Sequence, residues 1–110
     1  MTDIPILTVP LVEGLTIVEY KGLVTARNVR GINVVRDLLT AFRDVFGGRS
    51  GSYEKVMADM EQEVLNEIQA AACQLGANAV LSFSLDFDNI GAKGKSLIMA
   101  YGRGTAVVVQ

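Results

Sequence analysis

An alternating stretch at residues 79–88 constrains the fold of this chain more than any other part of its sequence. Apolar residues occupy every second position, and serine or aspartate fills most of the positions between them. Because successive side chains of a β-strand point to opposite sides, this period of two predicts a strand with one apolar face. Such a strand is typical of an antiparallel sheet that is covered on one side. The predicted covered face comprises Ala79, Leu81, Phe83, Leu85 and Phe87.

Two segments with helical periodicity precede this strand. Apolar residues recur every three or four positions in residues 32–46 and 53–75, which predicts two helices that each bury one side. Ser52 is placed to cap the second helix, and Gly76 is placed to end it. The apolar stripe of the second helix comprises Tyr53, Val56, Met57, Met60, Val64, Ile68, Ala71, Ala72 and Leu75.

A β-rich run at residues 16–29 precedes both helical segments. Gly22 interrupts the run and predicts a bulge or bend there. A shorter edge strand or arm is expected around residues 6–9, which lie between two prolines. One face of the long strand is predicted to carry Val18, Tyr20 and Val24.

Further strands are expected after the alternating stretch. A hairpin loop is predicted at residues 89–95, and a turn or bend at 102–104 separates strands at 96–101 and 105–110. The element order β-α-α-β-β-β predicts an α+β fold, in which an antiparallel β-sheet carries two helices packed on one face. No linker divides the chain, so residues 1–110 are expected to form a single domain.

The hydrophobic content exceeds what a small monomer can bury. Half of the 110 residues are hydrophobic, whereas a domain of this size hides only roughly two-thirds of its unfolded surface. No apolar run is long enough to span a membrane, and the N-terminal residues lack the basic region of a signal peptide. Residues 107–109 are all valine, so this terminal strand needs cover on both faces. We therefore expect a homo-oligomer whose subunit interfaces bury the surplus.

Charge and residue usage exclude several functions. The net charge is −2, which does not fit a nucleic-acid partner. The chain has no histidine and one cysteine, Cys73, which suits a reducing cytoplasm and leaves no intrachain disulfide. Cys73 is the one thiol that could hold a soft metal ion. It is expected to lie exposed or at a subunit interface rather than in the core, as a spectator thiol. Without histidine, the commonest acid–base group is missing, so neither an enzymatic activity nor a cofactor is predicted.

The turn at residues 47–54 combines three glycines, an arginine, two serines and a helix N-terminus. Two interpretations remain open. Arg49 and the backbone N–H groups of residues 52–54 bind a small anion such as phosphate. Alternatively, the turn only connects two helices, and Arg49 pairs with an acid in its own or a neighbouring subunit.

Four segments together resemble one family. They are IVEYKGLVTA at 17–26, NVVRDLLTAFRDVFGGRSGSYEKV at 33–56, QAAACQLGANAV at 69–80 and GTAVVV at 104–109. These segments resemble the YbjQ-like proteins, which are catalogued as a heavy-metal-binding domain without an established activity. The resemblance implies an α+β subunit in a homopentameric ring. The positions that match its most specific segment are candidates for a ligand or interface surface: Arg36, Asp37, Arg43, Asp44, Arg49, Ser50 and Tyr53.

These observations favour a small cytoplasmic, ring-forming protein that binds a ligand or partner, or acts as an assembly module, without enzymatic activity. The alternative is a metal-binding protein whose ligands come from several subunits at their interfaces. A third hypothesis is an enzyme with an anion-binding active site at Arg49.

Overall fold

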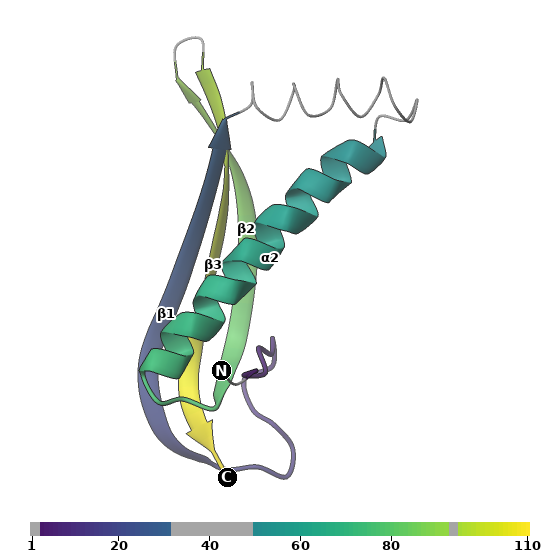
Figure 1. The fold of residues 1–110 in the computed structure, drawn as a ribbon. Coiled ribbons are helices and arrows are strands. Elements are labelled where there is room, and N and C mark those ends of the chain that lie inside the picture. Colours follow the sequence, from purple (N-terminus) through teal and green to yellow (C-terminus); the bar gives the residue numbers. More distant parts are fainter. Residues whose placement is uncertain (1–2, 32–49, 93–94) are drawn as a thin grey trace.

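The structure, a computed structural model, describes residues 3–31, 50–92 and 95–110. Three long antiparallel strands form one sheet in the order β1-β3-β2, and helix α2 lies along one face of it (Figure 1). This arrangement confirms an α+β fold with an antiparallel sheet. The first predicted helix, at 32–46, lies outside the described residues. The described elements are β1 (Ile17–Gly31), α2 (Ser50–Gln74), β2 (Ala79–Ala92) and β3 (Lys95–Val109).

Strand β3 is continuous, so the turn predicted at residues 102–104 is wrong. The glycines there serve close packing. A Cβ atom on Gly102 would lie 2.5 Å from Cγ1 of Val64 in α2, and one on Gly104 would lie 2.6 Å from Cγ1 of Val80. The hairpin loop is also shorter than predicted, because β2 and β3 pair as far as Ala92 and Lys95.

The central position of β3 overturns one argument for an interface. The terminal valines were expected to need cover from another subunit. Instead, β3 lies between β1 and β2, and Val107 is fully buried against Ala79 and Leu81. Leu7 and Val12, from the N-terminal segment, pack against the same cluster. The chain therefore buries Val107 by itself, and Val108 and Val109 are half-buried.

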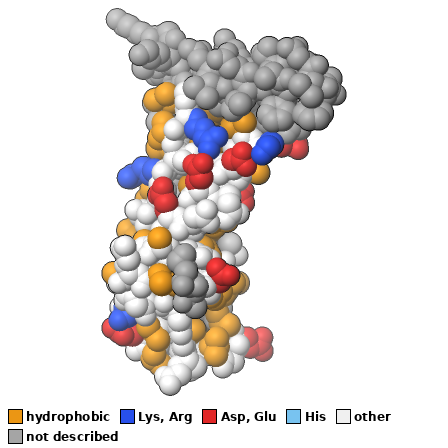
Figure 2. Space-filling view, viewed as in Figure 1, with side chains coloured by type: hydrophobic (Ala, Val, Ile, Leu, Met, Phe, Trp, Pro, Cys, Tyr) orange, Lys and Arg blue, Asp and Glu red, His pale blue; other side chains and the backbone are white. Residues whose placement is uncertain are grey.

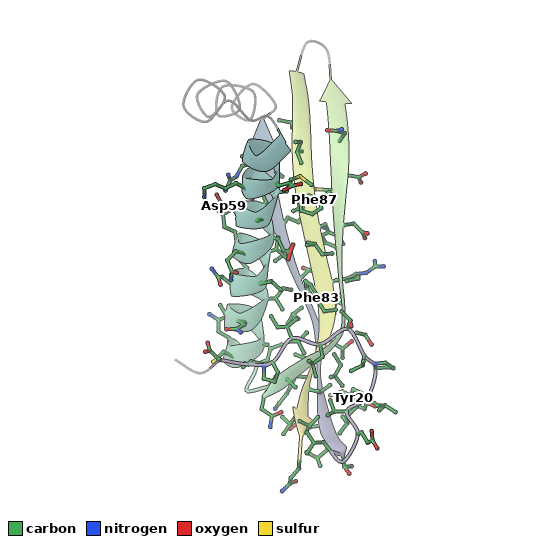
Figure 3. The ribbon with its side chains drawn as sticks, turned by 90° about the vertical axis from the view of Figure 1, so that its right-hand side faces the viewer. Tyr20, Asp59, Phe83 and Phe87 are labelled. Carbon is green, nitrogen blue, oxygen red and sulfur yellow. The ribbon has the colours of Figure 1, made fainter. Side chains whose placement is uncertain are left out.

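Register shifts in β1 and β2 move side chains from one face of the sheet to the other. In β2 the register shifts between Leu81 and Ser84, and Ser82 has a positive φ of 55°. Since one extra residue reverses the alternation, Ala79 and Leu81 lie on the face opposite α2. The predicted common face is therefore wrong for these two residues. Phe83, Leu85 and Phe87 pack toward α2, as Figure 3 shows for the two phenylalanines.

The bulge predicted at Gly22 is confirmed. The register with β3 shifts between Tyr20 and Gly22, and Gly22 has a φ of 120°. The shift corrects the predicted face of β1, because Val24 is buried at 3% exposure whereas Val18 and Tyr20 are 52% and 71% exposed. A period of two cannot continue through a bulge.

Helix α2 packs mostly over β1 and β3. Its predicted stripe is buried or half-buried from Val56 to Ala72, but Leu75 is 43% exposed. The helix begins at Ser50, before the predicted cap Ser52, so Glu54 falls outside its first turn. It ends as predicted at Gly76, which has a φ of 80°, and the Ala77 N–H donates to the carbonyl of Ala72 at 3.1 Å. The Gly76 N–H also donates to the carbonyl of Cys73 at 3.0 Å, and these two bonds together form a Schellman motif.

The N-terminal segment forms the predicted arm. Ile6 pairs with Val80 in a parallel bridge, and neighbouring backbone bonds join the arm to the first part of β2. The side chain of Gln69 donates a 2.9 Å hydrogen bond to the carbonyl of Ile4, which anchors the arm to α2. Among the described residues, no helix is both long and apolar enough to cross a membrane.

Candidate functional site

Most residues predicted to form a site fall where the structure gives no description. Arg36, Asp37, Arg43, Asp44 and Arg49 lie outside the described residues. Ser50 and Tyr53 lie in the first turns of α2, where only the backbone is described. The structure therefore does not test the anion and pairing interpretations of Arg49.

Cys73 is exposed near the end of α2 and forms no disulfide, which confirms its predicted exposure. Within residues 3–31, 50–92 and 95–110, no group of three or more cysteine, aspartate or glutamate side chains is placed to hold a metal ion.

The upper part of the sheet face opposite α2 is an open surface, which we call the open face. It consists of Leu23, Thr25, Arg27 and Val29 of β1, Met99, Tyr101, Arg103 and Thr105 of β3, and Ser84, Asp86 and Asp88 of β2. Even on the central strand these side chains are not buried, since Arg103 is exposed and its neighbours are only half-buried. Within the described part of the chain, no second layer covers this face.

The open face carries both apolar and charged groups. Leu23 is 69% exposed and Val29 is 50% exposed. The guanidinium of Arg27 lies 4.8 Å from the centre of the Tyr101 ring, within cation–π range. Asp86 stands on the other side of Tyr101, so Arg27, Tyr101 and Asp86 form one row across the sheet.

The outer edges of the sheet have opposite charge on this face. Thr25, Arg103 and Ser84 form the row below, and Val29, Met99 and Asp88 form the row above. The β1 edge therefore presents Arg27, whereas the β2 edge presents Asp86 and Asp88. All three charged side chains are exposed.

On the α2 side, β1 is tied to the helix by a polar cluster. Nη2 of Arg30 donates to Oε1 of Glu63 at 2.7 Å, and the amide of Asn28 donates to the other carboxylate oxygen. The exposed Glu63 therefore joins the upper part of β1 to α2. This contact fixes the orientation of the strand whose outer edge is open.

A second apolar region lies at the lower end of the molecule, where hydrophobic side chains gather in Figure 2. Figure 3 shows Tyr20 there, at the lower end of the sheet. The exposed side chains of this region are Val9, Leu11, Leu15, Val18, Tyr20 and Leu75.

A cleft of about 140 Å³ lies beside the upper half of α2. Its volume is below the ~300–1,000 Å³ of sites for drug-sized ligands. The lining residues are Met57, Phe87, Asp88, Asn89 and Ile98. The open face is therefore a stronger candidate for a functional surface than this cleft.

Comparison with known proteins identifies the family of this chain. The family model described as "Putative heavy-metal-binding" matches residues 4–110. The chain belongs to the YbjQ family. A UPF0145 protein from Pasteurella multocida is 44% identical over 105 residues, covering 96% of this chain and 98% of that protein. A UPF0145 protein from Caulobacter vibrioides is also 44% identical, over 104 residues that cover 94% and 98% of the two chains.

A solved structure shares the fold. It is a protein of unknown function from the DUF74 family of Pediococcus pentosaceus, with a TM-score of 0.66. The alignment covers 97% of this chain and 98% of the other, at 16% identity. The match shows that this YbjQ-family chain and a remote relative adopt the same fold.

Sequence reasoning missed the open face as a surface. The alternation at residues 79–88 placed Asp86 and Asp88 on the polar side of their strand, but neither was predicted as a site residue. The pattern contained the necessary information, since Leu23, Thr25, Arg27 and Val29 alternate with the buried residues of β1. Only the strand order shows that these two strands are the two edges of one sheet.

Proposed function

We propose that this YbjQ-family protein is a cytoplasmic assembly module without enzymatic activity, which works as a closed homo-oligomeric ring. The open face is the single observation that carries the proposal. Leu23 exposes 69% of its surface in the isolated chain and Val29 exposes 50%. Among the residues that the structure describes, α2 covers the other face of this sheet and nothing covers the open face. Association of copies covers such a surface and satisfies exposed strand edges.

The extended shape of the subunit supports the same proposal. Strands of 14 and 15 residues are much longer than the usual 5–6. The radius of gyration is 17.1 Å, whereas a compact chain of this length has about 13 Å. A chain with this much surface for its size gains stability when copies cover one another.

Light scattering coupled to gel filtration tests this proposal. We expect a single species at micromolar concentration whose mass is five times the subunit mass of 11.8 kDa. The number five rests on the resemblance to ring-forming YbjQ-like proteins, and closure of a ring rests on the open edges. A monomer throughout the micromolar range would refute assembly, and a closed ring of another size would correct only the number.

The description of the family favours a second candidate function, which is heavy-metal binding by ligands from several subunits. Cys73 is its candidate ligand, as one thiol from each subunit of a ring. Titration of the assembled protein with zinc or copper distinguishes the two proposals. Weak binding without fixed stoichiometry, unchanged in Cys73→Ser, supports the assembly module. Submicromolar binding that Cys73→Ser abolishes replaces it with the metal-binding function.

A further inference from the structure

We propose that copies of this chain associate head to tail, with the upper outer edge of β1 in one copy against the upper outer edge of β2 in the next. The contacting stretches are residues 23–31 and 84–92. This inference rests on the proposed function, since it specifies the surface through which the ring assembles.

Both stretches have an open backbone edge. β1 pairs with β3 along one side only, and no described residue pairs with its other side. The N-terminal arm bonds to β2 at residues 80–83, and among the described residues nothing pairs with that edge from Ser84 onward. Each open stretch has nine residues, or about 30 Å of strand. Unpaired N–H and C=O groups along such an edge are a template for another strand.

The direction of the strands suits a cyclic assembly. β1 and β2 both run antiparallel to β3, and they are therefore parallel to each other. Rotation about an axis along the strands preserves their direction, so β1 of one copy meets β2 of the next as a parallel neighbour. A two-fold axis instead brings each edge against its own copy. The geometry thus allows both a ring and a dimer, and charge decides between them.

Charge complementarity favours the unlike edges. Pairing of two β1 edges brings Arg27 near Arg27, and pairing of two β2 edges brings Asp86 and Asp88 near their own copies. Like charges opposite each other destabilise a strand pair, whereas opposite charges stabilise it. In the head-to-tail contact, the row Arg27–Tyr101–Asp86 continues into the same row of the next copy, so Arg27 faces Asp86. A stagger of two residues places Arg27 opposite Asp88 or Ser84, on the same face.

The same contact covers exposed apolar surface. On the open face of β1, Val29 lies one row above Arg27 and Leu23 lies two rows below it. Because they stand on the edge strand itself, a neighbouring strand shields the outward side of both. The contact therefore combines backbone pairing, opposite charges and apolar burial at one edge.

Charge reversal gives the first test. Arg27→Glu and Asp86→Arg should each raise the concentration at which the oligomer dissociates, by roughly two- to fivefold per contact at low salt, the range of exposed ion pairs. The double variant restores an unlike pair and should return dissociation toward wild type. Glu61→Arg, on the exposed side of α2, is the control and should have no such effect. If all four variants dissociate at the same protein concentration, the assignment of the contact to these two edges is overturned.

Cysteine cross-linking distinguishes the head-to-tail contact from a dimer of like edges. In a Cys73→Ser background, Thr25→Cys marks β1 and Ser84→Cys marks β2, in one row of the sheet. A short bismaleimide should give no covalent dimer with either variant alone. Co-expression of the two should give covalent dimers, and the variant that carries both cysteines should give a ladder up to the closed ring. Ala70→Cys, exposed on α2, is the control and should not cross-link.

The outcomes separate this inference from the proposed function. Covalent dimers from a single-cysteine variant show that like edges meet, which overturns the head-to-tail contact. The head-to-tail contact is also overturned if light scattering shows an oligomer but the variant with both cysteines cross-links no more than the Ala70→Cys control. In that case the proposed assembly still stands. A monomer by light scattering refutes the proposed function and this inference together.

Discussion

Gly102→Ala should strongly destabilise the protein, because α2 approaches β3 directly above this glycine. A Cβ atom at position 102 would lie 2.5 Å from Cγ1 of Val64, and 3.1 and 3.2 Å from two ring carbons of Phe83. Non-bonded carbons prefer about 3.5–4.0 Å, so the added methyl group is at least ~1 Å too close to Val64. Val64 is fully buried, so its side chain has no free space into which to move.

The size of the effect follows from these distances. Overpacking a well-packed core typically lowers the free energy of unfolding by about 1–3 kcal/mol. The substitution meets neighbours from both α2 and β2, which places it at the upper end, near ~3 kcal/mol. Replacing glycine also reduces the entropy of the unfolded chain, which raises the free energy of unfolding by about 0.4–1 kcal/mol. The expected net loss is therefore about 2 kcal/mol.

Urea unfolding followed by circular dichroism measures this loss, at fixed protein concentration because association adds to stability. Gly31→Ala is the matched control, since its nearest neighbour is Leu97 at 4.0 Å, and it should change stability by less than ~0.5 kcal/mol. Val64→Ala removes the clashing methyl groups, so the double variant should be more stable than the sum of the two losses predicts. Strict additivity of Gly102→Ala and Val64→Ala would refute the packing explanation.

Three further variants probe the arm, the helix end and the glycine turn. Gln69→Ala removes the hydrogen bond to the carbonyl of Ile4 and should lower stability by about 1 kcal/mol, with faster limited proteolysis of the N-terminal arm as the direct measurement. Gly76→Ala forces a side chain into a φ of 80° and should lower the free energy of unfolding in urea by about 1 kcal/mol. Arg49→Ala should loosen the oligomer in a salt-dependent way if Arg49 pairs with an acid. If Arg49 binds an anion, the Arg49→Ala variant should elute from gel filtration as wild type does. Phosphate should then no longer raise its melting temperature.

Local patterns predicted the elements of this chain well where their period was unbroken. The buried stripe of α2 follows from a 3.6-residue period from Val56 to Ala72, and the Schellman ending follows from Gly76. The stripe fails at Leu75, which lies at the helix end, beyond the contact with the sheet. The N-terminal arm was also predictable, because its two prolines restrict it to an edge.

The errors have a common physical cause, which is that tertiary contacts set the local backbone. Nothing in the sequence around Ser82 marks a bulge, yet a positive φ there reverses the two faces of β2. Gly102 and Gly104 are typical of a turn in isolation, and only the nearness of Val64 and Val80 reveals that they are packing positions. The candidate surface was missed for the same reason, since strand order cannot be read from periodicity.

The placement of the bulges bears on why the edges are open. Proteins usually protect edge strands from unwanted pairing with bulges, prolines or lysines. All three register shifts recorded between the described strands lie in the lower part of the sheet. Two fall at residues 17–22 of β1, and one falls at residues 81–84 of β2, where the arm also covers β2. Residues 23–31 and 84–92 contain no proline or lysine, and they run in regular register with β3. The two stretches therefore lack the bulges and prolines that commonly protect edges, and the charges that they carry are opposite in sign, as expected of edges that pair with another copy of the chain.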